Sequence, residues 1–127
     1  MENATIIVML ALAEYIFFTV RVGASRGKLE VYAPACKGNE TFERMFRVQQ
    51  NTLEQLIIFI PATFAFAFYV SPVWVLVPGG IFLIGRFLYS IAYIKEPKSR
   101  APGMIMTLFA NAALVLVTLV NLLMNMV

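Results

Sequence analysis

The sequence has no histidine and no aspartate, and Cys36 is its single cysteine. The absence of histidine excludes a Ser-His-Asp triad, a Cys-His pair and any metal site that is held by imidazole. One cysteine cannot form an intramolecular disulfide, and no histidine is present to activate it as a nucleophile. We therefore interpret Cys36 as an incidental loop thiol, and we expect no metal cofactor.

Charged residues are also scarce, because they make up 13% of the 127 residues while hydrophobic residues make up 61%. A typical soluble domain is closer to one quarter charged and one half apolar. The apolar residues come in long blocks, which indicates membrane spans rather than one large soluble core. The net charge of +3 is too small and too localised to indicate a nucleic-acid partner.

Four apolar runs are long enough to cross a bilayer, which requires about 20 residues of helix. They predict an all-α fold, an integral membrane four-helix bundle that forms a single domain over residues 1–127. The predicted spans are about 3–22, 41–70, 73–94 and 101–126.

The distribution of lysine and arginine predicts how the bundle is oriented. The connectors between the first and second spans and between the third and fourth spans hold nearly all of these residues. The remaining connector and both termini hold none. The positive-inside rule then places the two basic connectors in the cytoplasm and both termini outside or in a lumen. The choice between a bacterial inner membrane and the endoplasmic reticulum stays open.

A row of polar residues stands at the predicted cytoplasmic start of the second span. Arg47, Asn51 and Glu54 are spaced i, i+4 and i+7, so they share one face of a helix. Together they offer a guanidinium, an amide and a carboxylate. Such a row can bind a small zwitterion that carries both carboxylate and amine groups.

A second polar face lies in the third span, where Arg86, Tyr89 and Tyr93 are spaced i, i+3 and i+7. Two tyrosines alone are more often packing residues, but an arginine inside a span indicates a polar cavity or a buried pair. Glu14 lies at a comparable depth in the first span and is the candidate partner of Arg86. Taken alone, Glu14 fits a structural carboxyl that is paired or protonated, or a proton-coupled or ligand-binding site.

Two motifs in these spans resemble a known family. The E-R-x-x-R-x-x-x-N-x-x-E motif at residues 43–54 resembles the helix-two signature of the MAPEG family, the membrane-associated proteins in eicosanoid and glutathione metabolism. The G-R-x-x-Y-x-x-x-Y motif at residues 85–93, followed by Arg100, is similar to that family's third span. The resemblance covers the whole chain. The N-T-L-E sequence at 51–54 and the K-E-P sequence at 95–97 are most similar to the microsomal glutathione transferase branch.

The resemblance implies a membrane-bound glutathione transferase that conjugates the glutathione thiolate to lipophilic electrophiles, with a role in detoxification. It leaves open a lipid-hydroperoxide reductase activity of the glutathione-dependent peroxidase type. It also implies a homotrimer with a glutathione site between adjacent subunits, open to the cytosolic side. Glutathione would be the co-substrate, and membrane lipids and the electrophile would be the other partners. Arg100 matches the arginine that stabilises the thiolate, and is the expected catalytic residue. The expected glutathione-binding residues are Arg26, Arg47, Gln50, Asn51, Glu54, Tyr89 and Tyr93.

Two positions depart from the family's patterns. Gln55 stands where some catalytic members carry a tyrosine, which predicts a weaker glutathione contact. Tyr89 stands where another subgroup has histidine, so prostaglandin isomerase specificity is not expected. One alternative function is a non-catalytic lipid- or glutathione-binding member of the family. A small proton-coupled multidrug exporter using Glu14 is another, although such an exporter needs neither the polar row nor Arg100.

Overall fold

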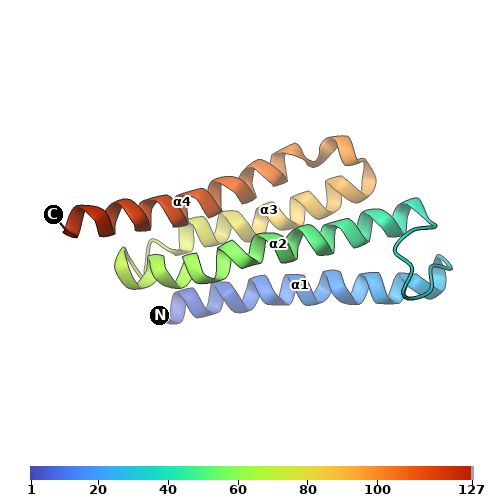
Figure 1. Ribbon diagram of the computed structural model, residues 1–127, viewed down its shortest axis with the longest axis horizontal. Coiled ribbons are helices and arrows are strands. Elements are labelled where there is room, and N and C mark those ends of the chain that lie inside the picture. Colours follow the sequence, from blue (N-terminus) through green and yellow to red (C-terminus); the bar gives the residue numbers. More distant parts are fainter. Residues whose placement is uncertain (127) are drawn as a thin grey trace.

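The computed structural model describes residues 1–126, which fold into four long helices and one short 3-10 helix. The helices lie side by side along one axis, and the N- and C-termini are at the same end (Figure 1). All four long helices are apolar and long enough to cross a membrane. The all-α, four-span architecture predicted from the sequence is therefore confirmed. The helices are α1 (Glu2–Lys28), α2 (Glu40–Tyr69), α3 (Leu76–Lys95) and α4 (Ala101–Met126), with η1 at Pro97–Arg100.

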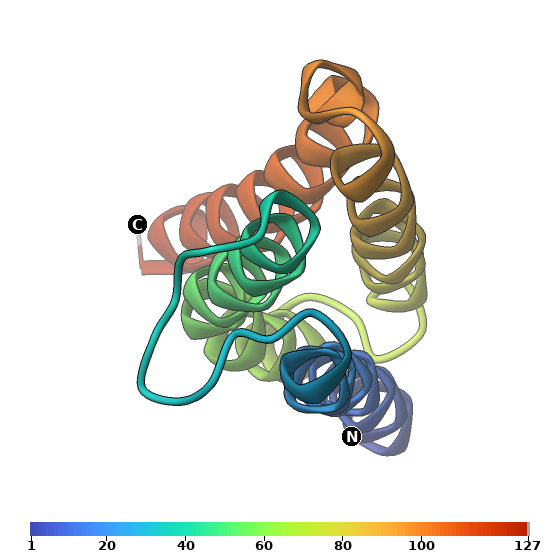
Figure 2. The same cartoon turned by 90° about the vertical axis from the view of Figure 1, so that its right-hand side faces the viewer.

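The two basic connectors lie together at the end of the bundle opposite the termini (Figure 1). One is the stretch between α1 and α2, and the other is η1, which leads directly into α4. Figure 2 views the molecule from this end and shows the α1–α2 connector arching away from the bundle. The basic residues are thus gathered at one end, as the positive-inside argument requires. The side of the membrane that this end faces stays a prediction.

Two helix boundaries differ from the prediction. The first helix continues to Lys28, beyond the predicted span of about 3–22, so the first residues of the predicted connector are helical. Arginine and lysine favour helix, and they mark where α1 leaves the hydrocarbon rather than where it ends. The third helix begins at Leu76 rather than at 73, because the Ser71 hydroxyl accepts hydrogen bonds from the N–H groups of Val73 and Trp74 and holds a turn there.

Small residues allow α3 and α4 to cross closely near the basic end. A Cβ on Gly103 would collide with the backbone of Tyr89 and with the carbonyl oxygen of Gly85. Such a close crossing of two backbones is typical of membrane helices, where small residues replace large ones at the contact. It fixes the start of α4, and therefore Arg100, against the part of α3 that carries the tyrosines.

Candidate functional site

Arg86 lies at the centre of a polar cluster inside the bundle. Its side chain is almost fully buried, with 1% exposed. Its Nη2 donates to Oδ1 of Asn51 at 2.8 Å, and its Nη1 donates to Oγ1 of Thr107 at 3.4 Å. Its guanidinium also stands over the ring of Tyr89, 4.4 Å from the centroid. One arginine therefore connects α2, α3 and α4 where they meet.

The predicted ion pair between Glu14 and Arg86 is wrong. The two side chains form no salt bridge within the described chain, and neither oxygen of Glu14 has a hydrogen-bond partner there. Arg86 instead directs its donors to neutral oxygens of Asn51 and Thr107 on α2 and α4. Comparable depth in two helices therefore did not bring the charged groups into contact.

The residues of the predicted polar row on α2 do not all face the same way: two are at the surface and one is inside the bundle. Arg47 and Glu54 share one exposed face, with Nη2 of Arg47 3.8 Å from Oε1 of Glu54 and each side chain about half exposed. Asn51, between them in the sequence, turns inward to Arg86. The row therefore places a half-exposed ion pair at the surface, and its middle residue bonds inside the bundle.

The two tyrosines of α3 lie between this row and the start of α4. The rings of Tyr89 and Tyr93 stack with centroids 5.4 Å apart. Tyr89 is buried and Tyr93 is half-buried. Arg100 lies three residues before Gly103, which packs against the backbone of Tyr89. The structure thus places Arg100 beside the part of α3 that carries both tyrosines, and Arg47 is near the start of α2 at the same, basic end (Figure 1).

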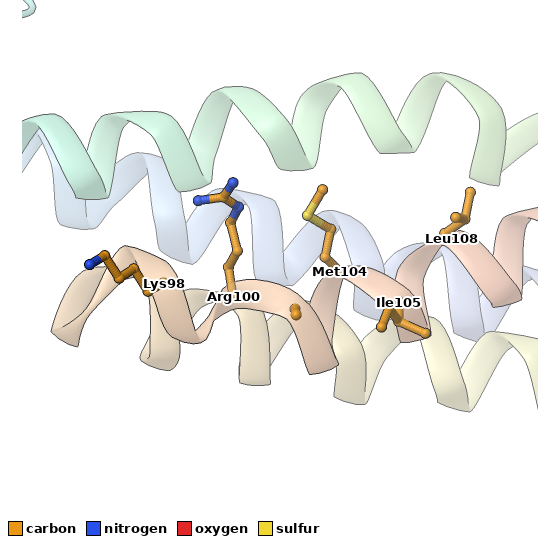
Figure 3. A pocket seen from close by; sticks show the side chains of 6 residues that line it. Lys98, Arg100, Met104, Ile105 and Leu108 are labelled. Atoms are coloured by element: carbon orange, nitrogen blue, oxygen red, sulfur yellow. The ribbon is translucent and has the colours of Figure 1, made fainter.

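Arg100 stands at one end of an open groove along the start of α4. It is exposed, and its Nη1 donates to the carbonyl oxygen of Pro97 at 3.2 Å, which holds it to η1. The side chains of Arg100, Met104 and Leu108 point to the same side (Figure 3). One end of the groove is therefore cationic and the rest is apolar. The groove is lined by Lys98, Arg100, Ala101, Met104, Ile105 and Leu108.

Neither of the two remaining predicted residues forms a side-chain hydrogen bond with this cluster among the described residues. Arg26 donates to the carbonyl oxygens of Val31 at 3.1 Å and Ala35 at 2.7 Å, and its guanidinium stands over the Phe42 ring at 4.9 Å. Within one chain it holds the α1–α2 connector against the start of α2. Gln50 is half-buried and makes no side-chain hydrogen bond among the described residues.

Two residues near the site have contacts that the sequence did not predict. Arg44 donates to the carbonyl oxygen of Ile94 at 3.1 Å and pairs with Glu40 at 2.8 Å, so it ties the start of α2 to the end of α3. Its place in the E-R-x-x-R motif was the only signal of this role. Oε1 of Gln55 accepts from Nδ2 of Asn111 at 3.0 Å, so this side chain is engaged with α4.

Comparison with known proteins identifies the family. A family model described as the MAPEG family matches residues 4–120. An uncharacterized protein of Synechocystis sp. is 38% identical over 118 residues, which cover 93% of this chain and 86% of that protein. The human protein named microsomal glutathione S-transferase 2 is 34% identical over 108 residues, covering 85% of this chain and 74% of the human one. The protein of the same name from Bos taurus is 30% identical over 115 residues, covering 91% and 79%.

The predicted resemblance is confirmed by these matches, and the exporter alternative is left without support. The family match covers nearly the whole chain, and the structure has four helices able to cross a membrane. The chain is a multi-pass integral membrane protein and belongs to the MAPEG family.

Proposed function

We propose that this protein is a membrane-bound glutathione transferase, which adds the glutathione thiolate to lipophilic electrophiles dissolved in the bilayer. The observation that carries this proposal is the position of Arg47 and Arg100 at the end of the bundle that holds the stacked tyrosines, with an apolar groove beside Arg100. Two relatives from human and cattle are named as glutathione S-transferases, which agrees with this chemistry.

The exposed face of α2 would hold the polar ends of glutathione. Arg47 and Glu54 are 3.8 Å apart and about half exposed, and an ion pair at such a surface contributes little stability. A ligand can therefore separate them at small cost. Arg47 would then bind a glutathione carboxylate and Glu54 the amine, with each exchanging one partner of opposite charge for another.

Arg100 would ionise the thiol. A free cysteine thiol has a pKa of about 8.5, and only the thiolate attacks. A guanidinium close to the sulfur favours the anion, and arginine keeps its own proton throughout. A lowering of the thiol pKa by about one to two units, roughly 1.4–3 kcal/mol, makes thiolate abundant at neutral pH. The sulfur then forms a bond to the electrophilic carbon, the leaving group departs with its electron pair, and the thiol proton goes to water.

The apolar groove beside Arg100 would hold the electrophile. Met104, Ile105 and Leu108 offer an alkyl or aryl group a surface that continues from Arg100 into the span. A lipid hydroperoxide in the same place would meet the same thiolate, so reduction of hydroperoxides is the second activity to assay.

A homotrimer with shared sites would explain why Arg26 lies apart from the cluster. Among the described residues, Arg26 donates to carbonyl oxygens of the connector and stands over the Phe42 ring. A neighbouring subunit packed against the exposed face of α2 would bring its own connector to the glutathione site. Native mass spectrometry in mild detergent tests this part, and a monomer with full activity would contradict it.

The test of the function compares purified protein with the Arg100→Ala variant, using glutathione and an aryl halide as substrates. We expect the wild type to accelerate the reaction well above the uncatalysed rate, and Arg100→Ala to return it close to that rate. Asn125→Ala is the control, because Asn125 is an exposed residue near the end of α4 opposite to Arg100. Equal, background-level rates in wild type and Arg100→Ala would contradict the enzyme and favour a non-catalytic binding protein.

A further inference from the structure

Arg21 carries an unpaired guanidinium near the end of the membrane span in α1. It forms no salt bridge within the described chain, and its Nε and Nη2 are buried there without a hydrogen-bond partner. The guanidinium stands over the rings of Phe17 and Phe18, 5.6 and 5.0 Å from their centroids, which holds it in place. A partly desolvated cation without a counter-ion is costly, and one at a membrane span is a candidate functional residue. Arg21 has no part in the proposed glutathione site, so its position needs a separate explanation.

Arg21 lines an open pocket of about 510 Å³ between the end of α1 and the start of α2, which lie side by side at the basic end (Figures 1 and 2). Lys28, two turns further along α1, lines it as well, and it too forms no salt bridge within the described residues. Two groups can reach an occupant: Nη1 of Arg21, which is not buried like the other two nitrogens, and the exposed ammonium of Lys28. The other lining residues are Ala24, Ser25 and Met45, so none of the five is acidic.

The charge of this pocket defines the chemistry of its occupant. The Ser25 hydroxyl already donates to the carbonyl oxygen of Val22 at 2.8 Å, so the available donors are the two cations. Arginine and lysine both bind phosphate groups, whose several oxygens can accept hydrogen bonds from two donors at once. The occupant is therefore an anion with phosphate-like oxygens.

The place of the pocket along the span indicates a lipid rather than a dissolved anion. Arg21 is at the end of the predicted span of about 3–22, where headgroups meet hydrocarbon. Phe17, one turn nearer the middle of the span, lines a second open groove of about 490 Å³ between α1 and α3. The accessible walls of that groove are apolar, since both carboxyl oxygens of Glu14 are buried, and they suit an acyl chain. The other residues of this groove are Leu10, Ala13, Leu83 and Phe87.

We propose that the pocket at Arg21 and Lys28 binds the phosphate of an anionic phospholipid, with an acyl chain along the apolar groove that begins at Phe17. Basic pockets between membrane helices on the cytoplasmic side bind such headgroups, and the basic end is predicted to face the cytoplasm. A zwitterionic phospholipid has the same phosphate but adds an ammonium group, which the two cations would repel. No residue of the pocket belongs to the proposed glutathione site, so this proposal stands independently of the transferase function.

Native mass spectrometry of the full chain in mild detergent tests the site, with phosphatidylglycerol or phosphatidylcholine of the same acyl chains as the titrant. We expect saturable binding of phosphatidylglycerol at about tenfold lower concentration than of phosphatidylcholine. Glycerol 3-phosphate, which has the phosphate but no acyl chain, should not displace the bound lipid at an equal concentration. Displacement by glycerol 3-phosphate at that concentration would overturn the assignment to a lipid.

Two variants assign the binding to this pocket. Arg21→Gln and Lys28→Gln should each weaken the binding of phosphatidylglycerol about fivefold or more. Lys37→Gln is the matched control, because Lys37 is an exposed lysine of the α1–α2 connector that does not line the pocket. Helical circular dichroism and elution volume check that the variants fold, and if Arg21→Gln does not, the comparison of Lys28→Gln with Lys37→Gln decides. Equal binding of the two lipids by the wild type, or the same loss in Lys37→Gln as in the folded pocket variants, would overturn the proposal.

Discussion

Asn51 of α2 accepts a hydrogen bond from Arg86 of α3 at 2.8 Å, so the two sequence motifs meet inside the bundle. Arg86 holds Thr107 of α4 and stands over Tyr89 at the same time. A single buried side chain thus fixes the positions of the helices that carry the proposed glutathione site. Loss of this side chain would lower the stability of the protein and change the geometry of that site.

Asn51→Ala should destabilise the protein by about 1.5–3 kcal/mol, because it leaves a buried guanidinium donor without its acceptor. Reversible unfolding in detergent measures the change. Asn125→Ala is the control, because Asn125 is exposed and bonds only to Asn121 on the same helix. A loss of stability that is no larger for Asn51 than for Asn125 would argue against a structural role of the Asn51–Arg86 bond.

Gly103→Ala should separate α3 from α4, because the added Cβ would collide with backbone atoms of Tyr89 and Gly85 that cannot move aside. Overpacking of this kind costs typically about 1–3 kcal/mol. Because the shift displaces Arg100 from the tyrosines, transferase activity should fall as well. Gly23→Ala is the matched control, since nothing lies within 4 Å of its added Cβ. Equal stability and activity in the two variants would contradict the close crossing.

Glu54→Gln should weaken glutathione binding, because it removes the carboxylate that is proposed to bind the amine of glutathione. Calorimetric titration with glutathione and with an analogue lacking the γ-glutamyl amine separates this effect from a general loss of the site. The wild type should prefer glutathione, and Glu54→Gln should bind both about equally. Glu43→Gln, which changes a carboxylate about three turns earlier on α2 that accepts from the Gly38 N–H, should keep the preference. If Glu54→Gln still preferred glutathione as strongly as the wild type does, Glu54 would not be the residue that binds the amine.

Arg100→Ala should move the pH dependence of kcat, which reports groups in the enzyme–substrate complex, to higher pH. If Arg100 holds the pKa of the bound thiol below its usual value of about 8.5, the wild-type rate reaches its plateau at lower pH. Without the guanidinium the rising limb should shift upward by about one to two pH units. A reduced rate with an unshifted profile would mean that Arg100 contributes to something other than ionisation of the thiol.

Cys36 offers a direct test of orientation, because it is exposed and is the sole cysteine. A membrane-impermeant maleimide should label it only after the membrane is made permeable, if the basic end faces the cytoplasm. Val73→Cys in a Cys36→Ser background should show the reverse, since Val73 is 63% exposed in the turn between α2 and α3. Labelling of Cys36 in intact cells would invert the predicted topology.

The fold was largely predictable because span length and apolar content are properties of the sequence alone. The boundaries were less predictable: the charge at Arg21 looks like the end of a helix, yet α1 continues to Lys28. The start of α3 depends on the Ser71 hydroxyl accepting two particular N–H bonds, and no composition argument specifies such a contact.

The site was predicted at the level of helix faces but not of side-chain partners. The spacing correctly placed Arg47 and Glu54 on one surface, but it could not show that Asn51 turns inward. The pairing of Glu14 with Arg86 failed for the same reason, since depth says nothing about direction. Arg26 lies apart within one chain, and a sequence does not show which residues meet across a subunit boundary.

The central claim is that fixed arginines at the basic end hold glutathione with its sulfur ionised. Ultraviolet difference absorbance of the bound thiolate measures this most directly, with glutathione titrated into the detergent-solubilised protein at neutral pH. The account predicts a saturable thiolate signal in the wild type that is lost in Arg100→Ala while glutathione still binds. A wild type that binds glutathione with no thiolate signal, or with the same signal as Arg100→Ala, would contradict it.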